Sequence, residues 1–225
     1  TLMKELNPED IDGRVIIVPV VNTIAFETRW MHGNPIDYRD VTGSYVEEIP
    51  KGGSGPPKIT YYLTTKFYQE VLKQADFRLN LHGGDIEEDL LTGTMYRKTG
   101  DERKDQLNLK LCRAFGWEWI REGLPRVSSS PLEFPLTVGT EAGGMGRCQS
   151  DIISEVVRGC KNVMMQLGMV QGTPIVPPKA KVFNPYHLYA EHGGFFISNV
   201  RAGDVVKKGE ILGMIKDLFG NTLEE

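Results

Sequence analysis

Cysteine is scarce in this sequence, and it follows neither a metal-binding nor a disulfide pattern. Cys112, Cys148 and Cys160 are odd in number and far apart, and no two of them form a C-x-x-C pair. Structural zinc sites use such pairs, and small secreted domains use an even set of cysteines as a disulfide framework. We therefore expect a reduced, cytoplasmic protein without a structural zinc site.

Long apolar runs and an excess of positive charge are also missing. No run approaches the roughly 18 residues of a membrane-spanning helix. The sequence from Thr1 onward also lacks the basic start and apolar middle of a signal peptide. The formal net charge is -4, whereas nucleic acids and anionic membranes need a concentrated basic surface. We expect neither as a partner and leave a homo-oligomer open.

The pattern of apolar residues predicts an α/β fold. The chain has 225 residues, enough for one large domain and a smaller appendage. Helical spacing and β-rich runs alternate, which predicts a mostly parallel or mixed sheet flanked by helices. We predict helices over 60–75, 101–115 and 151–167, and strands over 13–20, 77–81 and 134–141. The run at 13–20 is wholly apolar, which favours a strand covered on both faces.

The residue pattern of the chain changes after Gly172. Short β-rich segments there are separated by Gly, Pro and Asp turns. We predict two domains, an α/β domain over 1–171 and a small all-β domain over 172–225.

Two polar side chains follow buried strands at equivalent places. His82 comes after FRLNL and is followed by two glycines, and Glu141 ends the run FPLTVGTE before AGGMG. Ligands of open α/β sheets bind beyond the carboxyl ends of the strands, so these residues are expected at opposite walls of one site. The alternative is a hydrogen-bonded structural histidine and a glutamate that caps a turn.

Four segments, in this order along the chain, carry a resemblance to a known family. They are GRVIIVPVVNTIAFETR, NLHGGD, TVGTEAGGMG and YAEHGGFFISNVRAGDVVKKGEILGMIKD. Together they resemble the succinylglutamate desuccinylase/aspartoacylase family of zinc-dependent deacylases. The resemblance implies a carboxypeptidase-like α/β domain and a C-terminal β-domain with a turn pattern similar to biotinyl and lipoyl modules.

The resemblance also implies roles for three residues. His82 is a zinc ligand, Glu141 is the general base acting on the zinc-bound water, and Arg29 polarises the scissile carbonyl. These roles are chemically coherent. Zinc lowers the pKa of its water toward 7, a carboxylate can accept the proton, and an arginine stabilises the charge that develops on oxygen.

The family's first metal motif is not found in this sequence. A glycine-flanked histidine with a glutamate three residues later is expected upstream of 13–20, before Thr1. The interpretation is that the α/β domain is N-terminally incomplete, with one zinc ion per site and its other ligands upstream. A catalytic zinc normally takes three protein ligands. We therefore expect these 225 residues alone to bind zinc weakly and to hydrolyse N-acyl amino acids negligibly.

The segment expected to bind the substrate also departs from the family pattern. Aligned without gaps from Pro35, the Asn-Arg pair that grips the substrate carboxylate falls on Thr42 and Gly43, whereas a shifted alignment supplies Arg39. An arginine fork binds a carboxylate through two parallel hydrogen bonds, which threonine and glycine do not provide. Three alternatives stay open: a substrate without that carboxylate, binding by Arg39, or an impaired site.

The leading hypothesis is a zinc-dependent hydrolase that cleaves the amide bond of a small N-acyl amino acid or related N-acyl amine. The alternative is a non-catalytic binding protein on the same fold that has lost the metal site. A weaker third option, based on the C-terminal segment, is an acyl-carrier or carrier-binding module. It requires a modifiable lysine on a tight hairpin, and Lys216 lacks that flanking pattern.

Overall fold

The computed structural model describes residues 1–28, 59–84, 88–125 and 135–225. Before the first strand come the helices α1 (Leu2–Glu5), η1 (Pro8–Asp10), α2 (Thr23–Thr28), α3 (Ile59–Glu70) and η3 (Leu72–Gln74). The elements that follow are β1 (Phe77–Leu81), β2 (Gly93–Arg97), α4 (Glu102–Phe115), β3 (Trp119–Gly123), β4 (Leu136–Glu141) and α5 (Ser150–Gln166). The last strands are β5 (Lys181–Phe183), β6 (Phe195–Ser198), β7 (Gly213–Lys216) and β8 (Thr222–Glu224).

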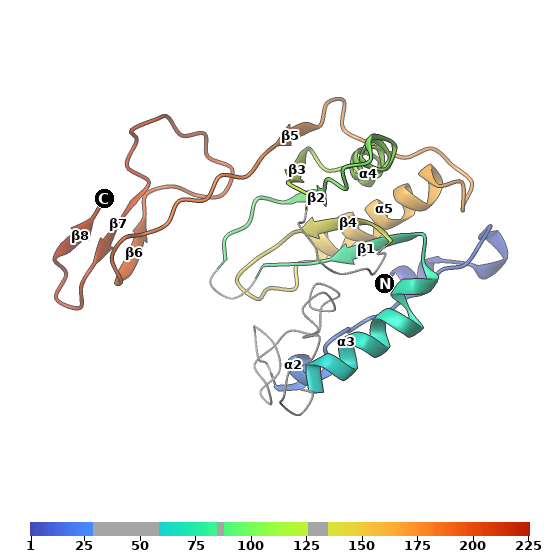
Figure 1. Ribbon diagram of the computed structural model, residues 1–225. Coiled ribbons are helices and arrows are strands. Elements are labelled where there is room, and N and C mark those ends of the chain that lie inside the picture. The colour runs from blue at the N-terminus through green and yellow to red at the C-terminus, as the bar shows by residue number, and fades with distance from the viewer. Residues whose placement is uncertain (29–58, 85–87, 126–134) are drawn as a thin grey trace.

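A mixed five-stranded sheet forms the centre of the molecule (Figure 1). Its order is β1-β4-β2-β3-β5, so chain order and spatial order differ. β1 and β4 are parallel, β2 runs antiparallel to β4, and β3 and β5 run parallel to β2. The carboxyl ends of β1 and β4 therefore meet at one edge of the sheet, and those of β2 and β3 meet at the opposite edge.

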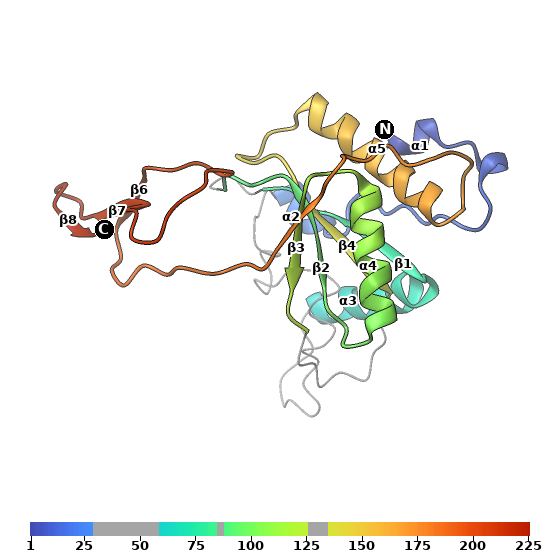
Figure 2. The same cartoon turned by 90° about the horizontal axis from the view of Figure 1, so that it is seen from above.

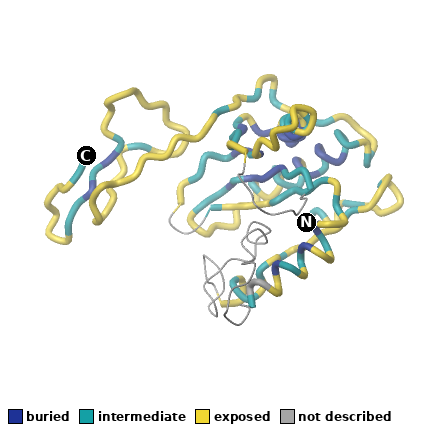
Figure 3. The backbone as a smooth tube through the Cα atoms, viewed as in Figure 1, coloured by how far each residue is buried: buried dark blue, intermediate teal, exposed yellow. Residues whose placement is uncertain are grey.

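The main core lies between this sheet and the helices α4 and α5. It is formed by Tyr96, Leu111, Cys112, Phe115, Trp117, Ile120, Val138, Ala142, Cys160 and Val163. Figure 3 shows buried residues concentrated on the central strands and on these two helices. The Asp101 carboxylate accepts hydrogen bonds from the first backbone N–H groups of α4, which is how the sequence marks the start of that helix.

The fold class predicted from the sequence is confirmed, and so are most of its elements. The three predicted helices correspond to α3 with η3, to α4 and to α5, and the strands predicted at 77–81 and 134–141 are β1 and β4. Two strands of the five-stranded sheet were not predicted, β2 and β3. Each has five residues, and in both polar residues and glycine interrupt the apolar pattern.

The prediction of a buried strand at 13–20 is wrong. This segment has no strand assignment, and Ile16, Ile17 and Val18 are between 37% and 42% exposed. β-branched residues favour extended backbone, but a strand also needs a hydrogen-bonded neighbour. Within the described part of the chain β1 pairs only with β4, and the 13–20 segment adds no strand on the other side of β1.

A second, antiparallel sheet lies toward the C-terminus, in the order β6-β7-β8. Figures 1 and 2 both show it standing to one side of the five-stranded sheet. No helix occurs between residues 172 and 225, all of which are described. β5 lies within that range but pairs with β3 in the larger sheet. The domain division at residue 172 stays a prediction.

The described helices are all too short or too polar to cross a membrane.

Candidate active site

His82 is positioned by the end of β1 and by the neighbouring strand β4. Its backbone N–H donates to the Thr140 hydroxyl over 3.1 Å, and the same hydroxyl donates to the His82 carbonyl over 3.3 Å. The Thr140 side chain is buried, and its hydroxyl both accepts from and donates to the backbone of His82. These two bonds hold the His82 backbone beside β4 just beyond the last β1–β4 residue pair.

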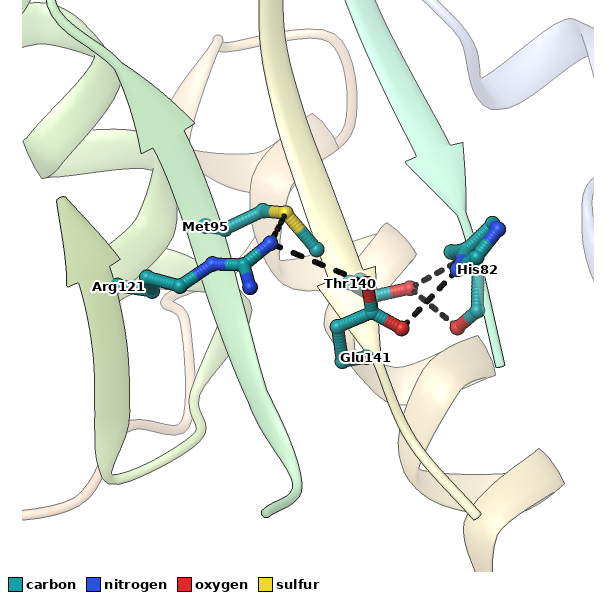
Figure 4. Close-up of polar contacts among 5 residues, drawn as sticks. All are labelled: His82, Met95, Arg121, Thr140 and Glu141. Carbon is teal, nitrogen blue, oxygen red and sulfur yellow. Dashed lines mark hydrogen bonds and ion pairs between the residues drawn. The ribbon is translucent and has the colours of Figure 1, made fainter. Parts of the chain in front are cut away.

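Glu141 is the last residue of β4 and directly contacts His82. The distance from the His82 Nδ1 atom to the Glu141 Oε2 atom is 3.0 Å (Figure 4). The predicted proximity of the two residues at one edge of the sheet is confirmed. They touch rather than face each other as opposite walls, because β1 and β4 are immediate neighbours. A hydrogen bond of this kind fixes the orientation of the imidazole ring.

The turns that follow the two strands approach each other very closely. A Cβ atom on Gly84 would lie 2.8 Å from the Gly144 Cα atom and 2.9 Å from a Leu90 methyl group. Real side chains essentially never come so close, so the contact between the two turns depends on glycine at position 84. The glycines after His82 therefore allow the two turns to pack and keep the His82 and Glu141 backbones at adjacent positions.

Arg121 is a third polar residue at this site, and it was not identified from the sequence. It extends from β3 across β2 toward β4, as Figure 4 shows. Its Nη2 atom donates to the Met95 sulfur over 2.8 Å and lies 4.0 Å from the Glu141 Oε1 atom. The signal that could have found it is the alternation in WIREG, where buried Ile120 precedes Arg121 on the opposite face of a strand.

Four of the site residues named from the sequence lie outside the described residues. They are Arg29, Arg39, Thr42 and Gly43. The structure therefore brings together His82 and Glu141 and adds Arg121, and the predicted roles of the other four stay predictions.

The described residues do not by themselves make up a zinc centre. They contain no group of three or more His, Cys, Asp or Glu side chains that could hold a metal ion. At the site they contribute one imidazole and one carboxylate, whereas a catalytic zinc normally takes three protein ligands. Any zinc bound here would need ligands from outside the described parts of the chain.

Comparison with curated proteins finds a deacetylase, although no family model matches the chain. The relative is the N-alpha-acetyl-L-2,4-diaminobutyric acid deacetylase of Halomonas elongata. It is 27% identical over 229 residues, which cover 96% of this chain and 65% of the relative. The chain thus spans less than two thirds of the length of this relative.

Solved structures show the same fold. The succinylglutamate desuccinylase/aspartoacylase from Rhodobacter sphaeroides has a TM-score of 0.82 and 25% identity, and the match covers 99% of this chain and 70% of that one. The product-bound ectoine utilization protein EutE (DoeB) from Ruegeria pomeroyi has the same TM-score, with 22% identity and the same coverages. The sequence and structure comparisons therefore confirm the resemblance read from the sequence: this chain is similar in sequence and fold to members of the succinylglutamate desuccinylase/aspartoacylase family.

Proposed function

We propose that this protein is an amide hydrolase that removes the acyl group from a small N-acyl amino acid or related N-acyl amine. The observation that supports this most is the contact between His82 and Glu141 at the ends of β1 and β4. A related protein named as an N-acetyl-diaminobutyric acid deacetylase supports the same reaction type. The proposed substrate is a small molecule. We also infer a cytoplasmic setting, because all three cysteine thiols are free.

In this proposal Glu141 is the general base. Its carboxylate accepts a proton from the attacking water as the new carbon–oxygen bond forms. It then gives that proton to the amine nitrogen as the carbon–nitrogen bond breaks. The hydrogen bond to His82 Nδ1 orients the carboxylate for both transfers. Arg29 is proposed to polarise the scissile carbonyl, with Arg39 or the segment at Thr42 and Gly43 contributing to substrate binding.

The proposal includes dependence on zinc. His82 is proposed as one ligand, and the others come from outside the described residues. This part rests on the family resemblance and on an imidazole at the carboxyl edge of the sheet.

Zinc content and amine release test the proposal together. We expect the 225-residue chain to retain well under one equivalent of zinc after dialysis, measured by elemental analysis. A longer chain that adds a His-x-x-Glu segment upstream is expected to retain one equivalent and to release amine from a panel of N-acyl amino acids. Stoichiometric zinc in the 225-residue chain would show that the ligand assignment is wrong.

The same assay separates the enzyme from its alternative. A longer chain that retains zinc and still releases no amine from any member of the panel would contradict the hydrolase and favour the binding protein. Amine release that disappears when Glu141 is replaced by glutamine would support the hydrolase, because glutamine keeps the shape of the side chain but does not accept the proton.

A further inference from the structure

The position of Arg121 leaves much of its guanidinium available to an anion. Both of its contacts, to the Met95 sulfur and toward Glu141, are made by Nη2. Among the described residues Nε and Nη1 have no hydrogen-bond partner, and the side chain is 40% exposed. A thioether sulfur is only a weak acceptor. At 4.0 Å, Glu141 lies beyond hydrogen-bonding distance, so the N–H groups of Nε and Nη1 are still able to donate to a carboxylate.

The packing beneath Arg121 holds its guanidinium in place. The side chain of Met95, which belongs to β2, lies over Gly139 of the neighbouring strand β4. A Cβ atom on Gly139 would come within 2.7 Å of the Met95 Cγ atom. Because Gly139 has no side chain, there is room for the Met95 side chain above it. The Met95 sulfur in turn accepts the hydrogen bond from Arg121. Three neighbouring strands thus hold the arginine over the sheet on the side of Glu141 (Figure 4).

The distance between Arg121 and Glu141 matches the chemistry of an α-amino acid. In an N-α-acyl amino acid the carboxylate and the amide nitrogen are attached to the same carbon. The group that binds the carboxylate must therefore lie within a few Å of the group that protonates the nitrogen. Arg121 and Glu141 are 4.0 Å apart and satisfy this requirement.

We propose that Arg121 binds the α-carboxylate of the substrate and makes the site selective for N-α-acyl amino acids. This inference rests on the proposed function, because it uses Glu141 as the proton donor to the amine. It also supplies a carboxylate-binding residue that does not depend on the segment containing Arg39, Thr42 and Gly43.

Ligand binding tests the inference without relying on turnover. The probes are N-α-methylsulfonyl-L-2,4-diaminobutyric acid, whose sulfonamide is not cleaved as an amide, and its α-carboxamide. By isothermal titration calorimetry we expect the unaltered chain to bind the carboxylate about 10- to 100-fold more tightly than the carboxamide, as for a charge-assisted hydrogen bond. Arg121→Gln should remove this preference, and Arg121→Lys should retain part of it.

The controls separate recognition from other effects. Arg113→Gln removes one positive charge from an exposed position on α4 and should leave the preference unchanged. An equal loss of affinity for both probes in Arg121→Gln would mean that the residue only positions its neighbours and would overturn the inference. So would an unaltered chain with no preference for the carboxylate.

Failure of the inference and failure of the proposed function give different results. Amine release with a carboxylate preference that survives in Arg121→Gln would overturn only the role of Arg121. A preference that depends on Arg121, in a protein that releases no amine, would overturn only the hydrolase.

Discussion

The two edges of the five-stranded sheet each carry a glutamate near the end of a parallel strand pair, but their surroundings differ. At one edge Glu141 of β4 meets His82 after β1, and at the other Glu122 of β3 lies beside Tyr96 and Lys98 of the β2 segment. The two pairs point in opposite directions because β2 runs antiparallel to β4. One fold therefore offers two candidate sites, and their hydrogen bonding distinguishes them.

The Glu122 edge is internally satisfied. The Tyr96 hydroxyl donates to Glu122 Oε2, and the Lys98 Nζ atom lies 2.8 Å from Glu122 Oε1, so both carboxylate oxygens have partners. Bonds from Lys98 and Tyr96 lower the pKa of the Glu122 carboxyl. Burial and the bond to Glu122 raise the pKa of the Tyr96 hydroxyl. The result is a structural network in which each charge already has its counterpart.

The Glu141 edge keeps more of its hydrogen-bonding capacity. Its carboxylate contacts a histidine, and the arginine opposite is held by a sulfur atom rather than by a second carboxylate. Groups that must exchange protons or bind a substrate need such capacity, whereas groups that stabilise the fold use it up. The comparison teaches that a carboxylate at a strand end indicates a functional site only when its partners leave it able to react.

The largest expected effect separates the two glutamates by activity. Glu141→Gln should reduce amine release by about 10²- to 10⁴-fold, because it removes the proposed general base. Glu122→Gln is the matched control and should leave turnover within a few fold of the unaltered protein. Initial rates on an N-acyl amino acid in the zinc-loaded, longer chain would check both. Equal losses in the two variants would remove the distinction between the edges.

An intermediate effect is expected from Gly139→Ala. The added Cβ atom would meet Met95 at 2.7 Å, and overpacking of this kind costs about 1 to 3 kcal/mol of unfolding free energy. Urea denaturation measures this loss. The loss caused by Gly139→Ala should be smaller when it is measured in the Met95→Ala background, because the truncated side chain at position 95 no longer occupies the space. A loss that is unchanged in the double variant would show that Met95 is not the obstacle.

The smallest effect is a change in stability at the Glu122 edge. Glu122→Gln should lower the unfolding free energy by about 1 kcal/mol at pH 7, because a charge-assisted hydrogen bond is lost. The difference should itself depend on pH. The folded-state pKa of Glu122 is lowered, so its stabilisation is present above its ordinary value of 4.5 and is lost as the pH falls through the folded value.

Chemical denaturation at pH 7 and at about pH 3 would test this sign, since an unperturbed glutamate carboxyl is mostly protonated at the lower pH. The stability difference between the two proteins should be smaller at the lower pH. A gap that widens on acidification would contradict the hydrogen-bonding account. Tyr96→Phe is a useful companion, because it removes one donor and keeps the ring in the core.

Several elements could be predicted because their signals are local. The helix α4 has a capping aspartate at Asp101 and apolar residues at helical spacing, so its start and its buried side follow from the sequence. His82 and Glu141 could be paired in advance because each ends a β-rich run before glycines. A polar side chain at the carboxyl end of a strand is a local feature of the chain.

Strand partners were decided only by the tertiary structure. The run at 13–20 is more apolar than WIREG, yet WIREG is a sheet strand and 13–20 is not. Hydrogen bonds between strands join residues far apart in the chain, so the strength of a local β pattern does not say which neighbour will accept it.

The sequence by itself determined the fold class, the helices with strong periodicity and the two strand ends that carry His82 and Glu141. Only the tertiary structure decided that β2 runs antiparallel to β4, and this separates the Glu141 edge from the Glu122 edge. It also decided that Arg121 reaches Glu141, 20 residues along the chain and two strands away in the sheet. The physical reason is that a helix and its cap are made by neighbouring residues, whereas a site across three strands exists only after those strands have paired.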